Sequence, residues 1–276
     1  VLTRAVGHTS TRGGVRVRIA GSGREVTARV LVVATGATVR LPARLGLIRR
    51  RRPTAFGVRC YVRSRWGPDH IVGVYLRQIL PGYGWIFPLG NGLYNTGVVV
   101  FPSHRPGRLN NVREAFGLFA RCCGPAREMI GAAEEVGPLR GAMLRCGLRG
   151  TRLAGPTNVV AAGEAAGTTL PLLGEGLGKA METGELAARV IHETLTDGDG
   201  RGLAEYARRV GREFRPLYRG YRFGERCIGR AWLNDYMSRR VGRSPLLREL
   251  LAGLISGTRD PREVFSVGAV VRSFWR

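Results

Sequence analysis

A glycine-rich run, residues 163–184, holds the residue types best suited to bind a polar or anionic ligand. It follows the apolar residues 159–162, and this order predicts a strand, a glycine-rich crossing and a helix that begins near residues 174–176. The free N–H groups at a helix start carry a partial positive charge of roughly half a unit. Glycine lets a ligand approach the backbone, and Glu164 offers carboxylate oxygens to a ribityl or ribose hydroxyl. An ordinary strand-to-helix turn that uses glycine for packing is the alternative.

Three aromatic residues alternate along a second segment, residues 80–88. Tyr83, Trp85 and Phe87 are two positions apart, so they share one face of an extended strand. An apolar wall of this kind suits a long apolar ligand that has almost nothing to hydrogen-bond. The same spacing also fits a strand in a hydrophobic core, and spacing alone does not separate the two interpretations.

The strands that position these residues follow from the hydrophobic pattern. Alternation in 15–19 and 26–28 around a turn at 21–23 predicts a β-hairpin. The apolar run 31–34 predicts a strand buried on both faces that stops at Thr35 and Gly36. An antiparallel sheet is predicted from strands at 56–62, 71–79, 85–89 and 94–101, with a hairpin turn at residues 91–92 and a further strand within 136–148.

Helices are predicted on both sides of the glycine-rich run. Two of them cover residues 110–122 and 125–133. After the run, one helical face carries Leu177, Ala180, Met181, Gly184, Ala188, Ile191 and Leu195. From Leu203 the pattern is mostly helical, with breaks near Pro216, Pro245 and Pro261.

The first two segments resemble motifs of one protein family. Residues 163–167 followed by 171–176 are similar to the second FAD-binding motif of the geranylgeranyl reductase family, a group of aromatic-hydroxylase-like flavoproteins. Glu164 stands where the family has Asp, and Leu177 where it has Ile. Residues 83–88 are similar to the family's Tyr-x-Trp-x-Phe-Pro signature. Residues 31–37 are similar to the Ala-Thr-Gly strand end that closes over FAD in many two-dinucleotide-fold flavoproteins, where relatives often have Gly-Ala-Asp-Gly. Thr35 replaces an acidic residue there, so a carboxylate contact is not carried over.

The resemblance implies a set of site residues. It assigns prenyl-substrate binding to Tyr83, Trp85 and Phe87, with Tyr83 as the candidate proton donor and no metal site. It assigns FAD binding to Thr35, Gly36, Gly163, Glu164, Gly167, Pro171, Gly174, Glu175, Gly176 and Leu177. The implied reaction is reduction of C=C bonds in a prenyl lipid by hydride transfer from reduced FAD, with NAD(P)H or a ferredoxin as the electron donor.

The resemblance also implies an α/β fold with α+β elements. We expect an incomplete Rossmann-like FAD-binding domain at 1–40 and 153–200, an inserted antiparallel-sheet substrate domain at 41–152 and a helical C-terminal region at 201–276. Relatives begin with a Gly-x-Gly-x-x-Gly loop that holds the FAD pyrophosphate, and this sequence has none. We therefore expect the C-terminal part of a longer flavoprotein, a fragment that binds FAD poorly or not at all on its own.

Composition limits the other function classes. The net charge is +24, but Lys179 is the only lysine among 44 basic residues, which indicates a biased genome rather than a nucleic-acid-binding face. Peripheral association of a cytoplasmic protein with the inner face of an anionic membrane stays open. The five cysteines show no zinc spacing and are expected to be reduced thiols. The rival functions are an FAD-dependent monooxygenase or halogenase and a basic non-catalytic protein bound to membrane or nucleic acid. A halogenase would also need a catalytic lysine, and Lys179 lies inside the predicted FAD helix.

Overall fold

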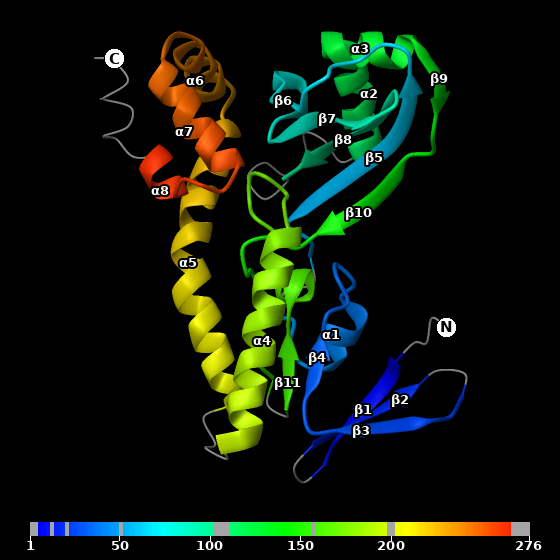
Figure 1. The fold of residues 1–276 in the computed structure, drawn as a ribbon, viewed down its shortest axis with the longest axis vertical. Coiled ribbons are helices and arrows are strands. Elements are labelled where there is room, and N and C mark those ends of the chain that lie inside the picture. Colours follow the sequence, from blue (N-terminus) through cyan, green and yellow to red (C-terminus); the bar gives the residue numbers. More distant parts are fainter. Residues whose placement is uncertain are drawn as a thin grey trace. The chain divides into compact units, whose positions relative to one another are not determined.

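The computed structural model describes residues 5–11, 14–19, 22–49, 52–101, 111–155, 158–197 and 202–265. The chain forms two compact units (Figure 1). Unit 1 comprises Val1–Arg52, Arg145–Pro171 and Glu175–Tyr218, and unit 2 comprises Pro53–Leu144, Leu172–Gly174 and Arg219–Arg276. The domain boundaries expected from the sequence stay a prediction. Residues 21, 110 and 266–276, which belong to predicted elements, lie outside the described residues.

Unit 1 contains two small sheets. The strands β1 (Ala5–Thr11), β2 (Gly14–Ile19) and β3 (Glu25–Ala28) form an antiparallel sheet, and β4 (Leu31–Val33) pairs in parallel with β11 (Val159–Ala161). The hairpin predicted around residues 21–23 is confirmed. The prediction that 31–34 is buried on both faces is wrong, since Val32 is 44% exposed. In the described part of the chain β4 has one strand partner, β11, and its Val32 face is left open.

Long helices pack against this strand pair. The helical elements with residues in unit 1 are α1 (Arg40–Arg44), the 3₁₀ turn η3 (Gly163–Ala166), α4 (Leu177–Asp197) and α5 (Gly202–Ile228), whose last ten residues belong to unit 2. Helix α5 buries Tyr206, Phe214 and Tyr218 on one face, and the Tyr206 hydroxyl donates to the Ala161 carbonyl of β11 at 2.8 Å. The predicted break at Pro216 is wrong, because buried Phe214 and Tyr218 hold the helix on both sides of the proline.

Helix α4 buries a different face from the one that its apolar residues predicted. Thr183, Ala187 and Val190 are buried, whereas Leu177 and Met181 are 76% and 69% exposed. The burial of Thr183 depends on hydrogen bonds rather than hydrophobicity. Its hydroxyl donates to the Lys179 carbonyl at 2.7 Å and accepts the Gly163 N–H at 3.0 Å. Hydrogen bonding of this kind removes the cost of burying a hydroxyl.

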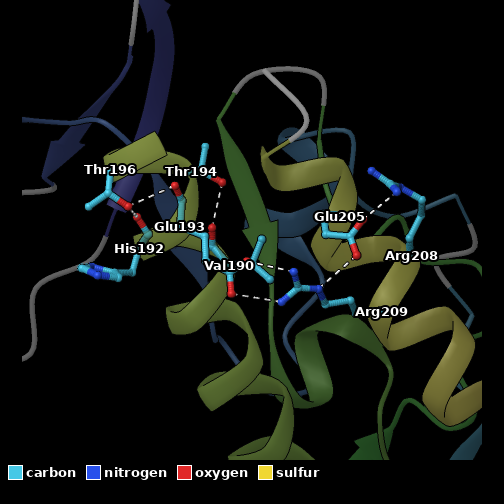
Figure 2. Close-up of polar contacts among 8 residues, drawn as sticks. All are labelled: Val190, His192, Glu193, Thr194, Thr196, Glu205, Arg208 and Arg209. Carbon is cyan, nitrogen blue, oxygen red and sulfur yellow. Dashed lines mark hydrogen bonds and ion pairs between the residues drawn. The ribbon is translucent and has the colours of Figure 1, made fainter. Parts of the chain in front are cut away.

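One arginine joins the two long helices (Figure 2). The Arg209 guanidinium of α5 contacts both carboxylate oxygens of Glu193 on α4, the shorter distance being 2.8 Å. Its Nε donates to Glu205 on its own helix at 3.0 Å. Arg208 pairs with the same Glu205 at 2.6 Å. A bidentate guanidinium–carboxylate pair fixes orientation better than a single contact, so Arg209 sets how α4 and α5 lie side by side.

Unit 2 is built on an antiparallel sheet of the order β10-β5-β8-β7-β6, with β9 also paired to β5. The strands are β5 (Ala55–Ser64), β6 (Val72–Val74), β7 (Gly82–Gly90), β8 (Leu93–Val100), β9 (Ala133–Val136) and β10 (Arg140–Leu144). The predicted strands are confirmed except in 71–79, where β6 pairs for three residues and the chain then forms the 3₁₀ turn η1 (Arg77–Ile79), which buries Ile79. Asn91 and Gly92 adopt positive φ in the turn between β7 and β8, as a tight hairpin requires.

Two helices cover one face of this sheet (Figure 1). They are α2 (Val112–Cys122) and α3 (Gly124–Gly131), which confirms both predicted helices. Phe119 of α2 and Met129 of α3 are fully buried against Val98 and Ile86 of the sheet. Gly84 of β7 is required here, because a β-carbon would lie 2.2 Å from the Phe119 ring.

The chain ends in short helices within unit 2. These are α6 (Ala231–Arg243), α7 (Pro245–Ile255) and α8 (Pro261–Val264), so the breaks predicted near Pro245 and Pro261 are confirmed. Ser244 and Asp260 cap α7 and α8 by accepting N–H groups of their first turns. The side-chain amide of Asn234 on α6 donates to the Tyr75 carbonyl at 3.5 Å, and Asp235 pairs with Arg77 at 3.4 Å. No helix among the described residues is long and apolar enough to cross a membrane.

Candidate functional site

The glycine-rich run begins in unit 1 with a tight 3₁₀ turn directly after strand β11. Gly163 and Gly167 adopt positive φ at the two ends of η3, where glycine is strongly preferred. A β-carbon at Gly163 would lie 3.1 Å from the Ala180 side chain of α4. These two glycines therefore allow the chain to turn sharply while helix α4 packs closely against it.

Glu164 lies on this turn and is held by two donors. Its Oε1 accepts the Arg145 main-chain N–H at 3.1 Å and the Thr169 hydroxyl at 3.3 Å. Burial raises the pKa of its carboxyl group, and the hydrogen bonds from Arg145 and Thr169 and the charge of Arg145 partly offset the rise. A carboxylate offers about four acceptor positions, so two bonds leave capacity for a ligand hydroxyl.

Arg145 is the charged residue next to Glu164 that sequence reasoning missed. It is 3% exposed, and its guanidinium donates to the Thr151 hydroxyl at 2.9 Å. Lys and Arg are rarely buried unless they are paired or hydrogen-bonded. Nothing in the sequence near Arg145 distinguishes it from the many exposed arginines of this chain, so its burial had no local signal.

Helix α4 begins at Leu177, directly after the predicted start near residues 174–176. The Leu170 N–H donates to the Glu175 carbonyl at 2.6 Å, and the Glu175 carboxylate accepts the Gly178 N–H at 2.8 Å. A β-carbon at Gly176 would lie 2.8 Å from the Thr169 hydroxyl. Glu175 thus caps the helix from outside its first turn, and glycine at 176 lets the chain pass close to Thr169.

These features of unit 1 fit a flavin cofactor. Helix α4 spans 21 residues, its first-turn N–H groups have no carbonyl within the helix to bond, and the Glu175 carboxylate already accepts the one of Gly178. Two of the three residues before it lack a β-carbon, and Glu164 supplies an acceptor for a sugar or ribityl hydroxyl. In unit 1 the residues that could hold FAD are therefore Glu164 and the segment from Glu175 to Leu177.

Three residues inside the run, Leu172–Gly174, belong to unit 2. The Tyr83 hydroxyl of β7 donates to the Leu173 carbonyl. Both Leu172 and Gly174 have positive φ, and the space beside the Gly174 α-carbon faces Tyr83 and Val99. Tyr83 therefore holds the turn that leads into the start of α4. Pro171, just before the turn, is buried.

The predicted aromatic row forms the face of β7 opposite α2. Ring centroids lie 6.0 Å apart both between Tyr83 and Trp85 and between Trp85 and Phe87, and Tyr75 lies 5.3 Å from Tyr83. Tyr83 and Trp85 are half-buried and Phe87 is exposed. The structure thus brings the three predicted substrate residues together on one partly open face and adds Tyr75, which sequence reasoning missed.

Trp85 is oriented by its neighbours on β8. Its indole N–H donates to the Asn95 side chain at 3.1 Å. A β-carbon at Gly97, the residue paired with Trp85, would lie 2.4 Å from the indole ring. The ring therefore lies over Gly97 and extends the aromatic row across the sheet.

Thr35 and Gly36 follow strand β4 in unit 1. The Thr35 hydroxyl donates to the Thr38 carbonyl at 3.3 Å, and Gly36 has a positive φ with open space beside its α-carbon. Gly36 thus leaves room for a ligand at the end of β4. Its role in FAD binding stays a prediction.

A separate pocket of about 290 Å³ lies between α4 and α5 in unit 1. It is lined by Leu186, Arg189, Arg209, Arg212 and Glu213, which include none of the predicted site residues. Arg189 pairs with Glu185 at 2.7 Å and Arg209 with Glu193 and Glu205, so carboxylates already neutralise two of the arginines. No group of His, Cys, Asp or Glu in the described ranges could hold a metal ion.

Comparison with solved structures identifies the class of fold. A geranylgeranyl bacteriochlorophyll reductase-like protein from Thermoplasma acidophilum aligns with a TM-score of 0.71, covering 99% of this chain and 66% of that chain at 18% identity. HpxO of Klebsiella pneumoniae in complex with FAD aligns with a TM-score of 0.64, covering 95% and 67% at 18% identity. The chain has the mixed α/β fold of FAD-dependent oxidoreductases, with an antiparallel sheet and C-terminal helices.

Sequence comparison narrows this class. Menaquinone reductase of Mycobacterium tuberculosis is 36% identical over 224 residues, which are 75% of this chain and 53% of that protein. Digeranylgeranylglycerophospholipid reductase 1 of Methanopyrus kandleri is 26% identical over 208 residues, 70% of this chain and 52% of that protein. No family model matches the chain. The relatives show that the chain belongs to the geranylgeranyl reductase-like family of FAD-dependent oxidoreductases, and it spans about half the length of the curated relatives it matches.

Proposed function

We propose that this chain contributes flavin-binding and substrate-binding residues to an FAD-dependent reductase that saturates C=C bonds in the prenyl chain of a quinone or a glycerophospholipid. The observation that carries the proposal is the half-open row of Tyr83, Trp85 and Phe87 in a chain whose relatives are reductases of menaquinone and of digeranylgeranylglycerophospholipid. A prenyl chain offers only apolar contacts, and an aromatic wall supplies them over a large area.

Unit 1 is proposed as an incomplete Rossmann-like FAD-binding part. The residues proposed to hold the cofactor are those that the resemblance assigned: Thr35, Gly36, Gly163, Glu164, Gly167, Pro171, Gly174, Glu175, Gly176 and Leu177. When bound in its reduced form, FAD would supply a hydride equivalent to one carbon of the double bond. The second carbon then needs one proton, so the product gains two hydrogen atoms. An NAD(P)H or ferredoxin-type donor is proposed to return the two electrons consumed in each turnover.

Within the proposed site, the chain's own residues would position the substrate and exclude water from it. The aromatic row lines the substrate and keeps water from it, and Tyr83 positions the Leu172–Gly174 turn before α4. Tyr83 is also the candidate proton donor. Proton delivery from its hydroxyl requires the bond to Leu173 to open and the tyrosinate to regain a proton from solvent afterwards.

Hydroxylase and halogenase chemistry is less well supported. The flavin-dependent halogenase CmlS shares the fold at 19% identity, with a TM-score of 0.56. A halogenase would need a catalytic lysine, and Lys179, the only lysine in the sequence, pairs with Glu182 at 2.6 Å and lies over the Phe214 ring at 5.2 Å. These contacts favour a structural role for Lys179.

We also propose that the protein associates peripherally with the cytoplasmic face of the membrane, where it would reach a prenyl lipid.

Deletion of the gene in its natural host tests the proposed function. Mass spectrometry of extracted quinones and lipids should show prenyl chains that have lost two hydrogen atoms per unreduced bond. Complementation with the wild-type gene should restore saturation, Trp85→Ala should restore little, and Trp66→Ala, an exposed loop residue, should restore it fully. Unchanged saturation in the deletion strain would rule out the proposed function.

A further inference from the structure

Helix α6 of unit 2 presents an exposed stripe that no function described so far uses. The α6 stripe consists of Trp232, Tyr236, Arg239 and Arg243. Their spacing of four, three and four residues places them on one side of the helix. Trp232 is 68% exposed and Tyr236 39% exposed, and both arginines are exposed.

The opposite side of the helix faces the rest of unit 2. Asn234 is buried and bonds the Tyr75 carbonyl, and Asp235 pairs with Arg77 at the flank of the stripe. Helix α6 therefore packs against unit 2 through a side other than the α6 stripe. Figure 1 shows α6 and α7 beside each other near the end of α5.

The two arginines of the α6 stripe form no ion pair with a carboxylate of the described residues. Among the described residues neither Arg239 nor Arg243 has a carboxylate partner, although most ion pairs of this chain involve arginine. Arginine near a helix C-terminus complements the helix dipole, which accounts for the charge but not for the tryptophan and tyrosine ahead of it. The stripe thus combines two exposed amphipathic rings with two unneutralised cations.

We propose that the α6 stripe docks the protein on an anionic phospholipid bilayer. Tryptophan and tyrosine rings settle at the boundary between lipid headgroups and acyl chains, and arginine side chains pair with anionic headgroups. A nucleic acid would also attract the arginines, but a duplex surface offers no apolar layer for the two rings.

The proposal rests on the proposed function, because it gives a prenyl-lipid reductase access to its substrate. Tyr75 connects the two features within unit 2. Its carbonyl accepts the Asn234 amide of α6, and its ring lies 5.3 Å from Tyr83 of the aromatic row. A bilayer at the α6 stripe would therefore lie one helix away from the proposed prenyl-binding face.

Co-sedimentation of the purified 276-residue chain with vesicles tests the docking surface. We expect binding to mixed phosphatidylcholine–phosphatidylglycerol vesicles, weak binding to phosphatidylcholine alone, and a decrease with added salt. The double variant Arg239→Gln/Arg243→Gln should weaken binding about thirtyfold, and Trp232→Ala/Tyr236→Ala should also weaken it. The matched controls are Arg208→Gln/Arg212→Gln on α5 and Trp66→Ala, which should bind like the wild type.

A second measurement tests the position of the stripe directly. Lipids brominated near the headgroup should quench tryptophan fluorescence in the wild type and much less in Trp232→Phe, whereas Trp66→Phe should keep the quenching. Equal binding by the stripe variants and the wild type would overturn the docking surface while leaving membrane association intact. Binding to RNA or DNA but not to vesicles would overturn both, and the saturation assay in the host reports on the reductase function independently of either result.

Discussion

The Tyr83 hydroxyl donates a hydrogen bond to the carbonyl of Leu173, 90 positions later in the chain. One aromatic residue of the proposed substrate face thereby holds the turn that leads into the proposed flavin helix. The residue that was expected to act as a proton donor thus has a structural partner. The bond gives Tyr83 a positioning role that does not depend on proton transfer.

Tyr83→Phe is expected to destabilise the chain. It removes the donor and leaves a partly buried carbonyl without its partner, which typically costs about 1–3 kcal/mol. Urea denaturation should report the loss as a lower midpoint with an unchanged slope. Tyr61→Phe on strand β5 of the same sheet is the control, and its exposed ring should make the change nearly neutral. Equal midpoints for Tyr83→Phe and the wild type would mean that the bond contributes nothing to stability.

The buried carboxyl group of Glu164 predicts a particular pH dependence. Its pKa is raised, mainly by burial, above the ordinary value of 4.5. The folded state therefore binds the Glu164 proton more tightly than the unfolded state does. The stabilisation from this group is complete below about pH 4.5 and is lost as the pH rises through the raised pKa.

Glu164→Gln should remove this dependence. Glutamine keeps an oxygen that can accept the bonds from Arg145 and Thr169 but has no charge to bury. The free energy of unfolding of the variant, relative to the wild type, should therefore increase from pH 4 toward pH 7. Urea denaturation at several pH values measures it, and a relative stability that falls as the pH rises would contradict the raised pKa.

The contribution of the Arg209 bridge between α4 and α5 to thermal stability should depend on ionic strength. Arg209→Gln removes contacts with both Glu193 and Glu205, whereas Arg208→Gln removes only a pair within α5. We expect a lower Tm for Arg209→Gln than for Arg208→Gln, and the gap should narrow at high ionic strength because salt screens exposed pairs. Indistinguishable Tm values at low salt would show that the bridge does not stabilise the helix pair.

Much of unit 2 was predictable because its signals are local. Alternating side chains mark β5, an apolar run marks the end of β8, and the Asn91-Gly92 turn sets the register between β7 and β8. The aromatic row also follows from alternation alone. By contrast, the bond from Tyr83 to Leu173 joins residues that no sequence pattern relates.

The errors in unit 1 come from contacts that the local hydrophobic pattern does not specify. Hydrophobicity alone placed Leu177 and Met181 inward, while hydrogen bonds from Gly163 and to Lys179 allow Thr183 to be buried instead. The expected burial of Val32 depended on neighbouring strands that a short apolar run does not specify.

Two glycines beside Trp85 offer the sharpest test of the aromatic face. Gly97 on β8 and Gly73 on β6 are both paired with Trp85, but the indole lies over Gly97 only. A β-carbon at Gly97 would approach both the indole and the Val58 carbonyl to 2.4 Å, whereas one at Gly73 would meet nothing within 4 Å. Gly97→Ala should therefore displace Trp85 and destabilise the chain by about 1–3 kcal/mol. Gly73→Ala should be neutral or slightly stabilising. Near-ultraviolet circular dichroism and urea denaturation measure both effects, and equal behaviour of the two variants would mean that Trp85 does not lie over Gly97 in solution.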